Sequence, residues 1–390
     1  MQWNTALPGI RGCGRQANKN LSRKISSQMS NNGLQERLRP YIEAVEQELS
    51  VLIDSACTCE EAAGLYNMLR YHLGWVEPDG SPVPAEDRVR FGGKRMRPAI
   101  CLLFSQLAGG DWHPALPAAA AVELIHSFSL IHDDVEDADE FRHHRYTVWS
   151  VWGVNHAVNS GSNTQALVNL AALRCKEFGH APEKVLDALH TITNAILRMT
   201  EGQYLDMRLE GSRIPTPETY QTMVRGKTCA LLSAACSLGW LLGSPEPRTS
   251  DVELAAAFGE ALGLAFQARD DFLGLWGDPN VTGKPVGSDL TKRKKTLPIV
   301  LAYHHANGDQ RRQMERFFAR RSIGRSDAES FMILLESLGA KNRALQEAEK
   351  LAEDAQKALE ALRPSEPSPP KAEAYNIIKD MVTFVLQRNY

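Results

Sequence analysis

Several common patterns are missing from this sequence. Its 390 residues include seven cysteines, and their spacing fits neither a zinc finger nor a disulfide framework. The single C-x-C pair, Cys57 and Cys59, is more typical of two ordinary thiols than of a site. We therefore expect a reduced, cytoplasmic protein.

The chain also lacks an excess of charge and a long uncharged apolar run. Its formal net charge is -3, which gives no indication of a nucleic-acid partner. No run reaches the roughly 18 apolar residues without charge that a membrane span needs, so we expect no such span. Because 43% of the residues are hydrophobic and 23% are charged, the composition is that of a globular protein with an ample core.

Strand signals are nearly absent, and so is any defensible Ser-His-Asp or Cys-His pattern. Apolar residues instead recur at three- and four-residue spacing, which predicts helices. The clearest helical segments are 34–53, 117–134, 184–207, 229–243, 251–276 and 372–387. Glycine- and proline-rich breakers separate them, and no repeat or composition shift divides the chain. We expect an all-α bundle that forms a single domain over residues 31–390.

The N-terminal extension, residues 1–30, carries several basic residues and no acid. A transit peptide has this charge pattern, but the segment has no sustained apolar face. We expect it to be disordered, or to result from a start codon placed too early, with Met29 as the true start.

An acidic cluster follows the most apolar predicted helix. Six of the eight residues from Asp133 to Glu140 are acidic. Asp133 and Asp137 are four residues apart, and such like charges on one helix face repel each other unless a cation offsets them. Oxygen ligands at this density suit Mg²⁺. A solvated acidic helix end is the alternative interpretation.

A second apolar helix ends in the adjacent acids Asp270 and Asp271, with Asp278 further on. Three basic stretches could face these acids: FGGKRMRP (91–98), RGKT (225–228) and GKPVGSDLTKRKKTLP (283–298). A lone basic loop is usually only solvated. Three of them, beside two acidic helix ends, predict a site for two diphosphates, one bound through metal and one bound directly by Arg and Lys.

These stretches, together with EGQYLD, stand in the order found in the trans-isoprenyl diphosphate synthases (polyprenyl synthetases), and the chain resembles that family from about residue 35 to 390. The resemblance implies a helical bundle around a deep apolar cavity, usually a homodimer. It also implies condensation of isopentenyl diphosphate with an allylic diphosphate, with Mg²⁺ as cofactor and three ions per active site.

The resemblance also assigns roles to individual residues. The implied metal ligands are Asp133, Asp134, Asp137, Asp270 and Asp271, and the implied catalytic residues are Asp133, Asp134, Lys227 and Asp270. By this resemblance, the allylic diphosphate would be contacted by Arg142, Lys227 and Lys284. Isopentenyl diphosphate would be contacted by Lys94, Arg97 and His126. Thr228 and Gln267 would lie near the forming cation.

The sequence departs from the family pattern in three places. His143 stands where a second arginine usually grips isopentenyl diphosphate, and Arg145 is a possible substitute. Ser162 replaces the aspartate of a Gly-Asp pair. Gly274 stands where many members have the last aspartate of the second motif, although some members share this glycine and Asp278 lies nearby.

Product length in this family depends on the depth of the cavity. Phe128 lies five residues before the first motif, where a bulky residue blocks the growing chain, and small Ser129 follows it. The pattern implies a C20 product first and a C15 product second. Ordinary core packing of Phe128 is the alternative.

Two other functions remain open at this point. A terpene synthase-like enzyme on the same scaffold would ionise an allylic diphosphate without adding isopentenyl diphosphate. The replacement of arginine by His143 motivates this possibility. A non-catalytic subunit of a heteromeric synthase is the third possibility, and the intact aspartate motifs argue against it.

Overall fold

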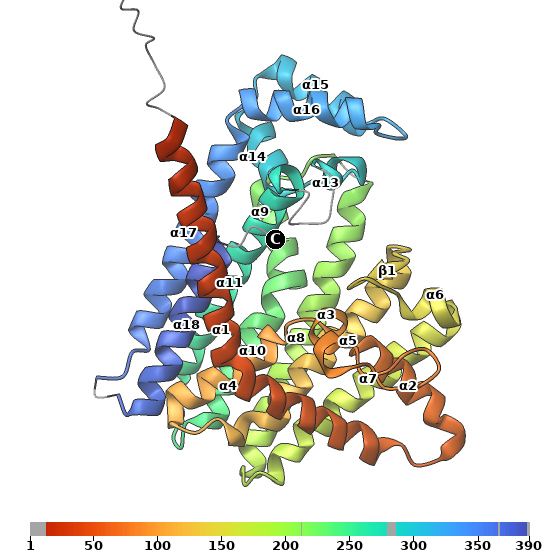
Figure 1. Cartoon of the computed structure of the whole chain (residues 1–390), viewed down its shortest axis with the longest axis vertical. Helices are drawn as coiled ribbons and strands as arrows, with labels where there is room; N and C mark the ends of the chain where they lie inside the picture. The colour runs from red at the N-terminus through yellow and green to blue at the C-terminus, as the bar shows by residue number, and fades with distance from the viewer. Residues whose placement is uncertain (1–12, 212, 279–285, 366, 388–390) are drawn as a thin grey trace, which may run out of the picture.

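The computed structural model describes residues 13–211, 213–278, 286–365 and 367–387. These residues are almost entirely helical, which confirms the predicted all-α class (Figure 1). Residues 1–12 of the predicted extension lie outside the described residues, and the first helix begins at Cys13.

The elements of the first half are α1 Cys13–Ala56, η1 Glu60–Ala62, α2 Ala63–His72, α3 Ala85–Gly92, α4 Met96–Gly109, η2 His113–Ala115, α5 Leu116–Glu136, β1 Phe141–Arg142, β2 Arg145–Tyr146, α6 Val148–Trp152, α7 Val154–Leu173, η3 Arg174–Lys176 and α8 Pro182–Glu210. Those of the second half are α9 Pro217–Val224, the π-helical turn η4 Arg225–Cys229, α10 Ala230–Gly243, α11 Thr249–Trp276, α13 Ser288–Thr291, α14 Leu297–His305, α15 Gly308–Phe318, α16 Arg325–Ser337, α17 Ala340–Ala361 and α18 Pro369–Gln387.

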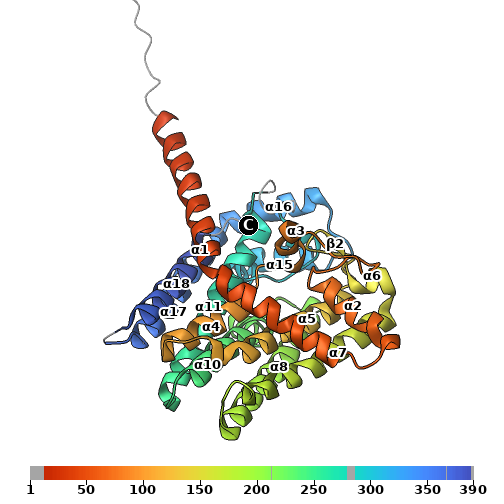
Figure 2. The same cartoon turned by 60° about the horizontal axis from the view of Figure 1, so that its bottom comes forward.

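Helix α5 occupies the centre of the bundle. Every residue from Pro117 to Ile125 is buried, because α1, α4, α7, α8 and α10 all pack against this helix (Figure 2). A helix that is apolar around its whole circumference needs such neighbours on every side. The acidic end of α5 is therefore fixed by the core of the molecule.

The stretch His113–Glu136 is long and apolar enough to cross a membrane, which the sequence analysis did not anticipate. However, 72% of its most apolar window is buried inside the molecule. That burial fits the core helix of a bundle.

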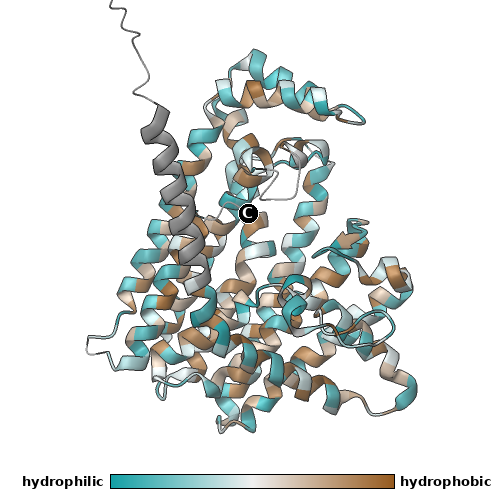
Figure 3. Ribbon diagram, viewed as in Figure 1, coloured by the Kyte–Doolittle hydropathy of each residue, from teal (hydrophilic) through white to brown (hydrophobic). Residues whose placement is uncertain are grey.

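Peripheral helices have the opposite character, with one hydrophobic side and one hydrophilic side, as on α17 (Figure 3). The buried positions of α17 include Ala340, Ala344, Ala348, Ala352 and Ala355. These alanines follow the spacing of one helix face. Small side chains at these positions let α17 pack closely against α11.

A short β-hairpin follows α5 and was not predicted. Strands β1 and β2 pair antiparallel, with Arg142 opposite Arg145. The two residues of the turn, His143 and His144, have φ values of 48° and 64°. Positive φ at both positions is the geometry of a type I′ turn, which usually contains Asn or Gly. The hairpin turns the chain back over the end of α5.

The buried side chain of Arg95 joins three parts of the bundle. Arg95 precedes α4 in a left-handed conformation with φ 47°. Its guanidinium lies 2.6 Å from Glu46 of α1 and 2.8 Å from Glu123 of α5. It also donates to the carbonyl oxygen of Leu73 at 2.8 Å. This network fixes the start of α4 relative to α5.

We expect Arg95→Met to lower the free energy of unfolding by about 3–5 kcal/mol, because Glu123 would remain buried without its cation. The control is Arg37→Met, which removes an ion pair with Asp380 at the exposed surface and should cost at most about 1 kcal/mol. Urea denaturation of both variants measures the difference. Equal, small losses would contradict a structural role for Arg95.

Candidate active site

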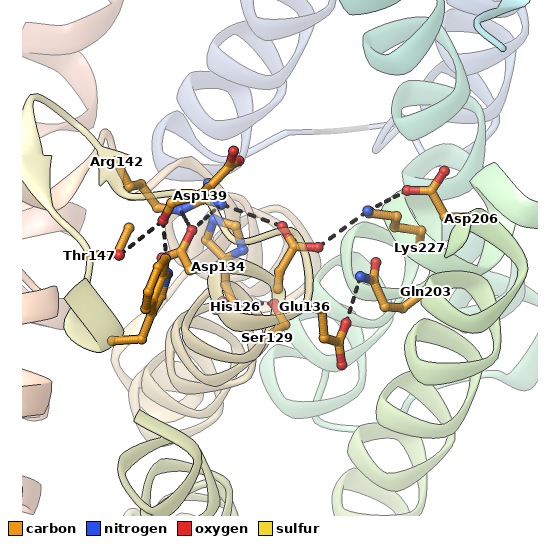
Figure 4. Close-up of polar contacts among 12 residues, drawn as sticks. His126, Ser129, Asp134, Glu136, Asp139, Arg142, Thr147, Gln203, Asp206 and Lys227 are labelled. Atoms are coloured by element: carbon orange, nitrogen blue, oxygen red, sulfur yellow. Dashed lines mark hydrogen bonds and ion pairs between the residues drawn. The ribbon is translucent and has the colours of Figure 1, made fainter. Parts of the chain in front are cut away.

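The acidic end of α5 is paired with cations from two other segments (Figure 4). Arg142 Nε donates to Asp134 Oδ1 at 2.7 Å, and Arg142 Nη2 lies 3.4 Å from Asp133 Oδ2. Lys227 Nζ lies 3.3 Å from Asp133 Oδ1. The repulsion expected among these carboxylates is thus partly offset by Arg142 and Lys227.

Asp134 is the buried member of this cluster, with 1% of its surface exposed. Burial raises the pKa of its carboxyl to about 6, although the nearby Arg142 acts in the opposite direction. The second oxygen, Oδ2, is buried and has no hydrogen-bond partner among the described residues. A buried carboxylate oxygen without a donor is destabilising unless a cation or water satisfies it.

Lys227 comes from the π-helical turn η4, and π-turns frequently occur at functional sites. A Cβ at Gly202 of α8 would lie 2.0 Å from the backbone nitrogen of Lys227. Only glycine at this position lets α8 and η4 approach so closely. The approach brings Lys227 Nζ within 2.6 Å of Asp206 Oδ2 on α8, while the neighbouring Thr228 donates to Gln267 Oε1 at 2.9 Å.

The second acidic pair lies at the end of α11, and its two members differ. Asp270 is exposed. Asp271 is 5% exposed, and its oxygens accept hydrogen bonds from Tyr220, Gln267 and the Leu297 amide at 2.5, 2.8 and 2.7 Å. Burial raises the pKa of Asp271 to about 7, even though these donors favour the ionised form. Asp271 therefore anchors the end of α11, and Asp270 is the more accessible carboxylate.

The basic loop before α14 is not merely solvated. Lys295 donates to the carbonyl oxygens of Leu209 and Glu210 and so satisfies the end of α8. Lys292 pairs with Asp139 at 3.0 Å. Lys294 faces the acids of the site: burial alone would lower its pKa, but the charges of acids that include Asp206 raise it above its usual value. Lys284 lies outside the described residues.

Arg97 and His126 form a third group beside the first cluster, and both line the same cavity as Asp133. Arg97 Nη1 lies 3.2 Å from His126 Nε2, and because guanidinium only donates, His126 is the acceptor. Burial and the charge of Arg97 lower the pKa of His126 well below its usual value. Lys94 is exposed, with Nζ 5.7 Å from the ring centre of Phe384.

His143 belongs to this third group, and Arg145 does not. A Cβ at Gly93 would lie 3.3 Å from His143 Cε1, so the imidazole lies against the loop that carries Lys94. Arg145 points elsewhere: it donates to the Val76 carbonyl oxygen at 2.8 Å and pairs with Glu77 at 2.9 Å. Arg145 is therefore engaged in structural contacts rather than placed as a substitute for the missing arginine.

Arg95 is likewise turned away from the anion group suggested by the sequence, because it is buried against Glu46 and Glu123. Of the three basic residues at 94–97, Arg95 is therefore the one that is held in the fold by buried ion pairs.

A cavity of about 220 Å³ opens below the first acidic cluster. Its lining includes Phe128, Ser129, His132, Met199 and Leu231. Phe128 is 6% exposed and belongs to the main core, while Ser129 Oγ donates to the His126 carbonyl oxygen at 2.8 Å. Charged and polar side chains line the same cavity, including Arg97, Asp133, Glu136, Gln203, Lys227 and Thr228. The cavity therefore combines ionic groups with a few apolar side chains.

A larger cleft of about 470 Å³ lies on another side of α8, between α8, α10 and η4. It contains none of the residues predicted for the site. Size alone therefore does not mark the functional cavity here.

No group of three or more His, Cys, Asp or Glu side chains converges as a metal site in the part of the chain that the structure describes. The donor set nevertheless fits Mg²⁺, which keeps several waters and completes its shell with phosphate oxygens rather than requiring a protein cage. The unpaired Oδ2 of Asp134 fits a nearby cation as well. The residues present are compatible with the predicted ion.

The structure brings several residues to the site that had no predicted role: Glu136, Gln203, Asp206, Tyr220 and Lys294. Gln203 donates to Glu136 at 2.8 Å. Gln203 and Asp206 lie three residues apart within the EGQYLD stretch, and this spacing places them on one helix face. That spacing is the feature of the sequence from which a role for Gln203 and Asp206 could have been predicted.

Comparison with known proteins agrees with this geometry. The family model for polyprenyl synthetase matches residues 83–334. The chain is 41% identical over 246 residues to a (2E,6E)-farnesyl diphosphate synthase of Mycobacterium bovis, covering 63% of this chain and 65% of the relative. It is 43% identical over 239 residues to a geranylgeranyl diphosphate synthase of Mycobacterium tuberculosis, covering 61% and 65%. The matched part thus spans less than two thirds of these curated relatives, 65% of their length.

Similarity of fold extends further along the chain. The crystal structure of a polyprenyl synthetase from Streptomyces coelicolor A3(2) superposes with a TM-score of 0.78 at 32% identity, covering 91% of this chain and 99% of that one. The family model covers well over half of the sequence and includes both acidic helix ends. The chain belongs to the polyprenyl synthetase family.

Proposed function

We propose that this protein is an Mg²⁺-dependent prenyltransferase that joins isopentenyl diphosphate head-to-tail to an allylic diphosphate. The observation that carries the proposal is the placement of acids and cations at a cavity that also has apolar side chains in its lining. Arg142 and Lys227 each lie within 3.4 Å of a carboxylate oxygen of Asp133, and Asp133 and Lys227 line the cavity. A substrate with an anionic head and an apolar chain matches this arrangement.

The residues that would hold Mg²⁺ are Asp133, Asp134, Asp137, Asp270 and Asp271, with three ions per site proposed by analogy with the family. These acids differ in how deeply they are buried. Asp270 is exposed, whereas Asp134 and Asp271 are buried, so the two buried acids would also orient the ends of α5 and α11. When bound, the ions would supply positive charge that stabilises the departing diphosphate.

Arg142 and Lys227 would hold the allylic diphosphate, together with Lys284 and Lys294. The bond between the allylic carbon and the diphosphate oxygen breaks, and the diphosphate keeps the electron pair. Thr228 and Gln267, which are bonded to each other at 2.9 Å, would present their oxygens to the allylic cation. Phe128, Met199 and Leu231 line the cavity and would limit the access of water, which would otherwise quench this cation.

Lys94, Arg97, His126 and His143 would hold the isopentenyl diphosphate. Its double bond attacks the allylic carbon and forms the new carbon–carbon bond. The proton lost from the adjacent carbon passes to the departed diphosphate. No protein nucleophile is required, in keeping with the absence of a nucleophile pattern in the sequence.

We further propose a C20 product, with C15 as the second possibility. Support comes from Phe128, whose ring lines the cavity below the first acidic cluster next to Met199 and Leu231. An aromatic side chain in that position limits the length of the prenyl chain that the cavity accepts. Cytoplasmic location is part of the same proposal and rests on the sequence alone.

Two alternative functions can be compared with the geometry of the site. A terpene synthase-like reaction would use the residues that hold the allylic diphosphate and would not need Lys94, Arg97 and His126. The histidine at position 143, in place of an arginine, favours this alternative. A non-catalytic subunit would not need Asp133 and Lys227 placed at the cavity, so the geometry disfavours it.

The direct test is incubation of the purified protein with Mg²⁺ and farnesyl diphosphate, with and without isopentenyl diphosphate, followed by mass spectrometry. We expect geranylgeranyl diphosphate only when isopentenyl diphosphate is present, and a loss of about 10³-fold in rate for Asp133→Asn. A hydrocarbon or alcohol formed from farnesyl diphosphate alone would establish the terpene synthase-like reaction instead. Absence of metal-dependent diphosphate release would favour the non-catalytic subunit.

His143→Arg should strengthen isopentenyl diphosphate binding at neutral and alkaline pH. Partial burial and the charge of Arg142 lower the pKa of His143, so the imidazole is neutral at pH 7 and protonates only at lower pH. In the wild type the KM for isopentenyl diphosphate should therefore change little from pH 8 to 7 and fall only as the pH decreases below the ordinary histidine pKa of 6.5. In His143→Arg the KM should be about tenfold lower at pH 8, the effect of one charge-assisted hydrogen bond.

His144→Arg is the matched control, because His144 occupies the same turn and also has positive φ. It should leave both the KM at pH 8 and its pH dependence within about twofold of wild type. Equal behaviour of the two variants in steady-state kinetics would exclude His143 from the diphosphate site.

A homodimer is proposed from a patch of exposed hydrophobic side chains on two contacting helices, α7 and α8. We call it the α7–α8 patch, and its members are Val154, Val158, Leu170, Leu173, Leu186, Leu197, Tyr204 and Met207. Their side chains are between 42% and 64% exposed. Large exposed apolar patches commonly mark protein–protein interfaces.

Leu197→Asp should convert the dimer to a monomer, because a carboxylate would be buried at the interface. Ile333→Asp is the control, since Ile333 is 70% exposed on the distant helix α16 and should leave the dimer intact. Light scattering after size exclusion gives the masses. A monomeric wild type, or dissociation only by Ile333→Asp, would rule out the α7–α8 patch as the interface.

A further inference from the structure

The basic loop before α14, residues 292–296, is attached to several parts of the molecule. Arg293 Nη2 donates to the Phe318 carbonyl oxygen at 2.5 Å, at the end of α15. Lys295 Nζ donates to two carbonyl oxygens in the last two residues of α8, at 2.7 and 2.6 Å. Side chains that follow one another in the loop are therefore bonded to different helices.

Lys292 connects the same loop to the segment that follows α5. Its Nζ lies 3.0 Å from Oδ1 of Asp139, a residue 153 positions earlier in the chain. Asp139 comes two residues after Asp137, the third aspartate of the first acidic cluster. One ion pair thus joins the basic loop to the end of the chain segment that carries this cluster.

The backbone of Asp139 is held firmly by its neighbours. Its amide donates to the Asp134 carbonyl oxygen at 3.0 Å. Its own carbonyl oxygen accepts hydrogen bonds from Thr147 Oγ1 at 2.9 Å and from Trp149 Nε1 at 3.0 Å (Figure 4). Thr147 is itself buried. The carboxylate of Asp139 therefore offers Lys292 a fixed point of attachment.

Lys294 lies between the attached residues of the loop and faces the site. It lines a cavity of about 110 Å³ together with Lys227, Gln267 and Asp271. Its amide donates to the Asp289 carbonyl oxygen at 2.9 Å, so its backbone belongs to the turn that Lys292 begins. The position of the Lys294 ammonium consequently depends on how firmly the loop is held.

We propose that Asp139 and Lys292 are positioning residues for the allylic diphosphate site, because their ion pair holds the basic loop with Lys294 facing that site. The inference rests on the proposed function, in which Lys294 helps to hold the allylic diphosphate. The side chains of the pair are 35% and 58% exposed, so the pair contributes little to the stability of the whole protein. Its effect is local, since a loop that is already ordered loses less entropy when a ligand binds to it.

The kinetic test uses Asp139→Asn and Lys292→Met with farnesyl diphosphate as the allylic substrate. Each variant should raise the KM for farnesyl diphosphate about fivefold, the upper end of what an exposed ion pair contributes. The kcat should stay within about twofold of wild type, because the lost interaction supports binding and not the chemical step. An unchanged KM in both variants would overturn the proposal.

A double-mutant cycle shows whether the two residues act together. The double variant Asp139→Asn/Lys292→Met should have a KM no higher than that of either single variant, because both substitutions remove the same ion pair. The charge swap Asp139→Lys/Lys292→Asp should return the KM to within about twofold of wild type. Additive losses in the first double variant, or a folded charge swap with a KM as high as the single variants, would contradict the pairing.

Hydrogen–deuterium exchange of the ligand-free protein tests the attachment without any measurement of activity. Asp139→Asn should increase deuterium uptake in a peptide that covers 290–296, because local opening of the loop becomes more frequent. The matched control is Asp380→Asn, which removes an ion pair with Arg37 whose side chains are 36% and 55% exposed. This control should leave the uptake in 290–296 and the KM as in the wild type. Equal uptake in Asp139→Asn and the wild type would show that the ion pair does not hold the loop.

The two levels of the proposal fail in different ways. If the wild type converted no allylic diphosphate, the proposed function would be wrong, and the positioning role with it, whatever the exchange experiment showed about the loop. If the wild type were active and Asp139→Asn changed neither the KM nor the exchange, only the role of Asp139 and Lys292 would be wrong.

Discussion

Repulsion among carboxylates at the end of a buried helix is the constraint on which the rest of the site depends. Helix α5 is enclosed by other helices along most of its length, so its acidic end cannot turn away into solvent. Arg142 and Lys227 reach Asp133 and Asp134 from two separate segments and reduce the repulsion. The hairpin and the π-turn can therefore both be understood as means of delivering a cation to one point.

Apolar periodicity in the sequence was sufficient to predict the helical class, and the order of the motifs was sufficient to name several residues that the structure places near one another. Asp133, Arg142 and Lys227 were each named from the sequence, and the structure places them in contact. The reason is that each belongs to a short segment whose helix end or turn is set by local patterns. Glycines such as Gly202, which permit the close approach of α8 and η4, are visible in the sequence, but their contact partners are not.

Side-chain direction was not predictable in the same way. Lys94, Arg95 and Arg97 look equivalent in sequence, yet Arg95 is buried with two carboxylates of α1 and α5. Those partners are 49 and 28 residues away along the chain, and no local pattern links them. Asp271 is a similar case, because its three donors come from α9, α11 and the start of α14. The hairpin was missed because two histidines in its turn give no Asn-Gly signal.

Under the proposed function, the ion pairs of the site would also govern how ligands enter it. A metal ion that arrived alone would have to displace Arg142 or Lys227 from the carboxylates, and a diphosphate that arrived alone would have to draw the same cations away from them. If both arrived, the carboxylates could pair with the metal while the arginine and lysine paired with the phosphate oxygens. The two ligands would then be thermodynamically coupled by this change of partners, and each would raise the affinity for the other.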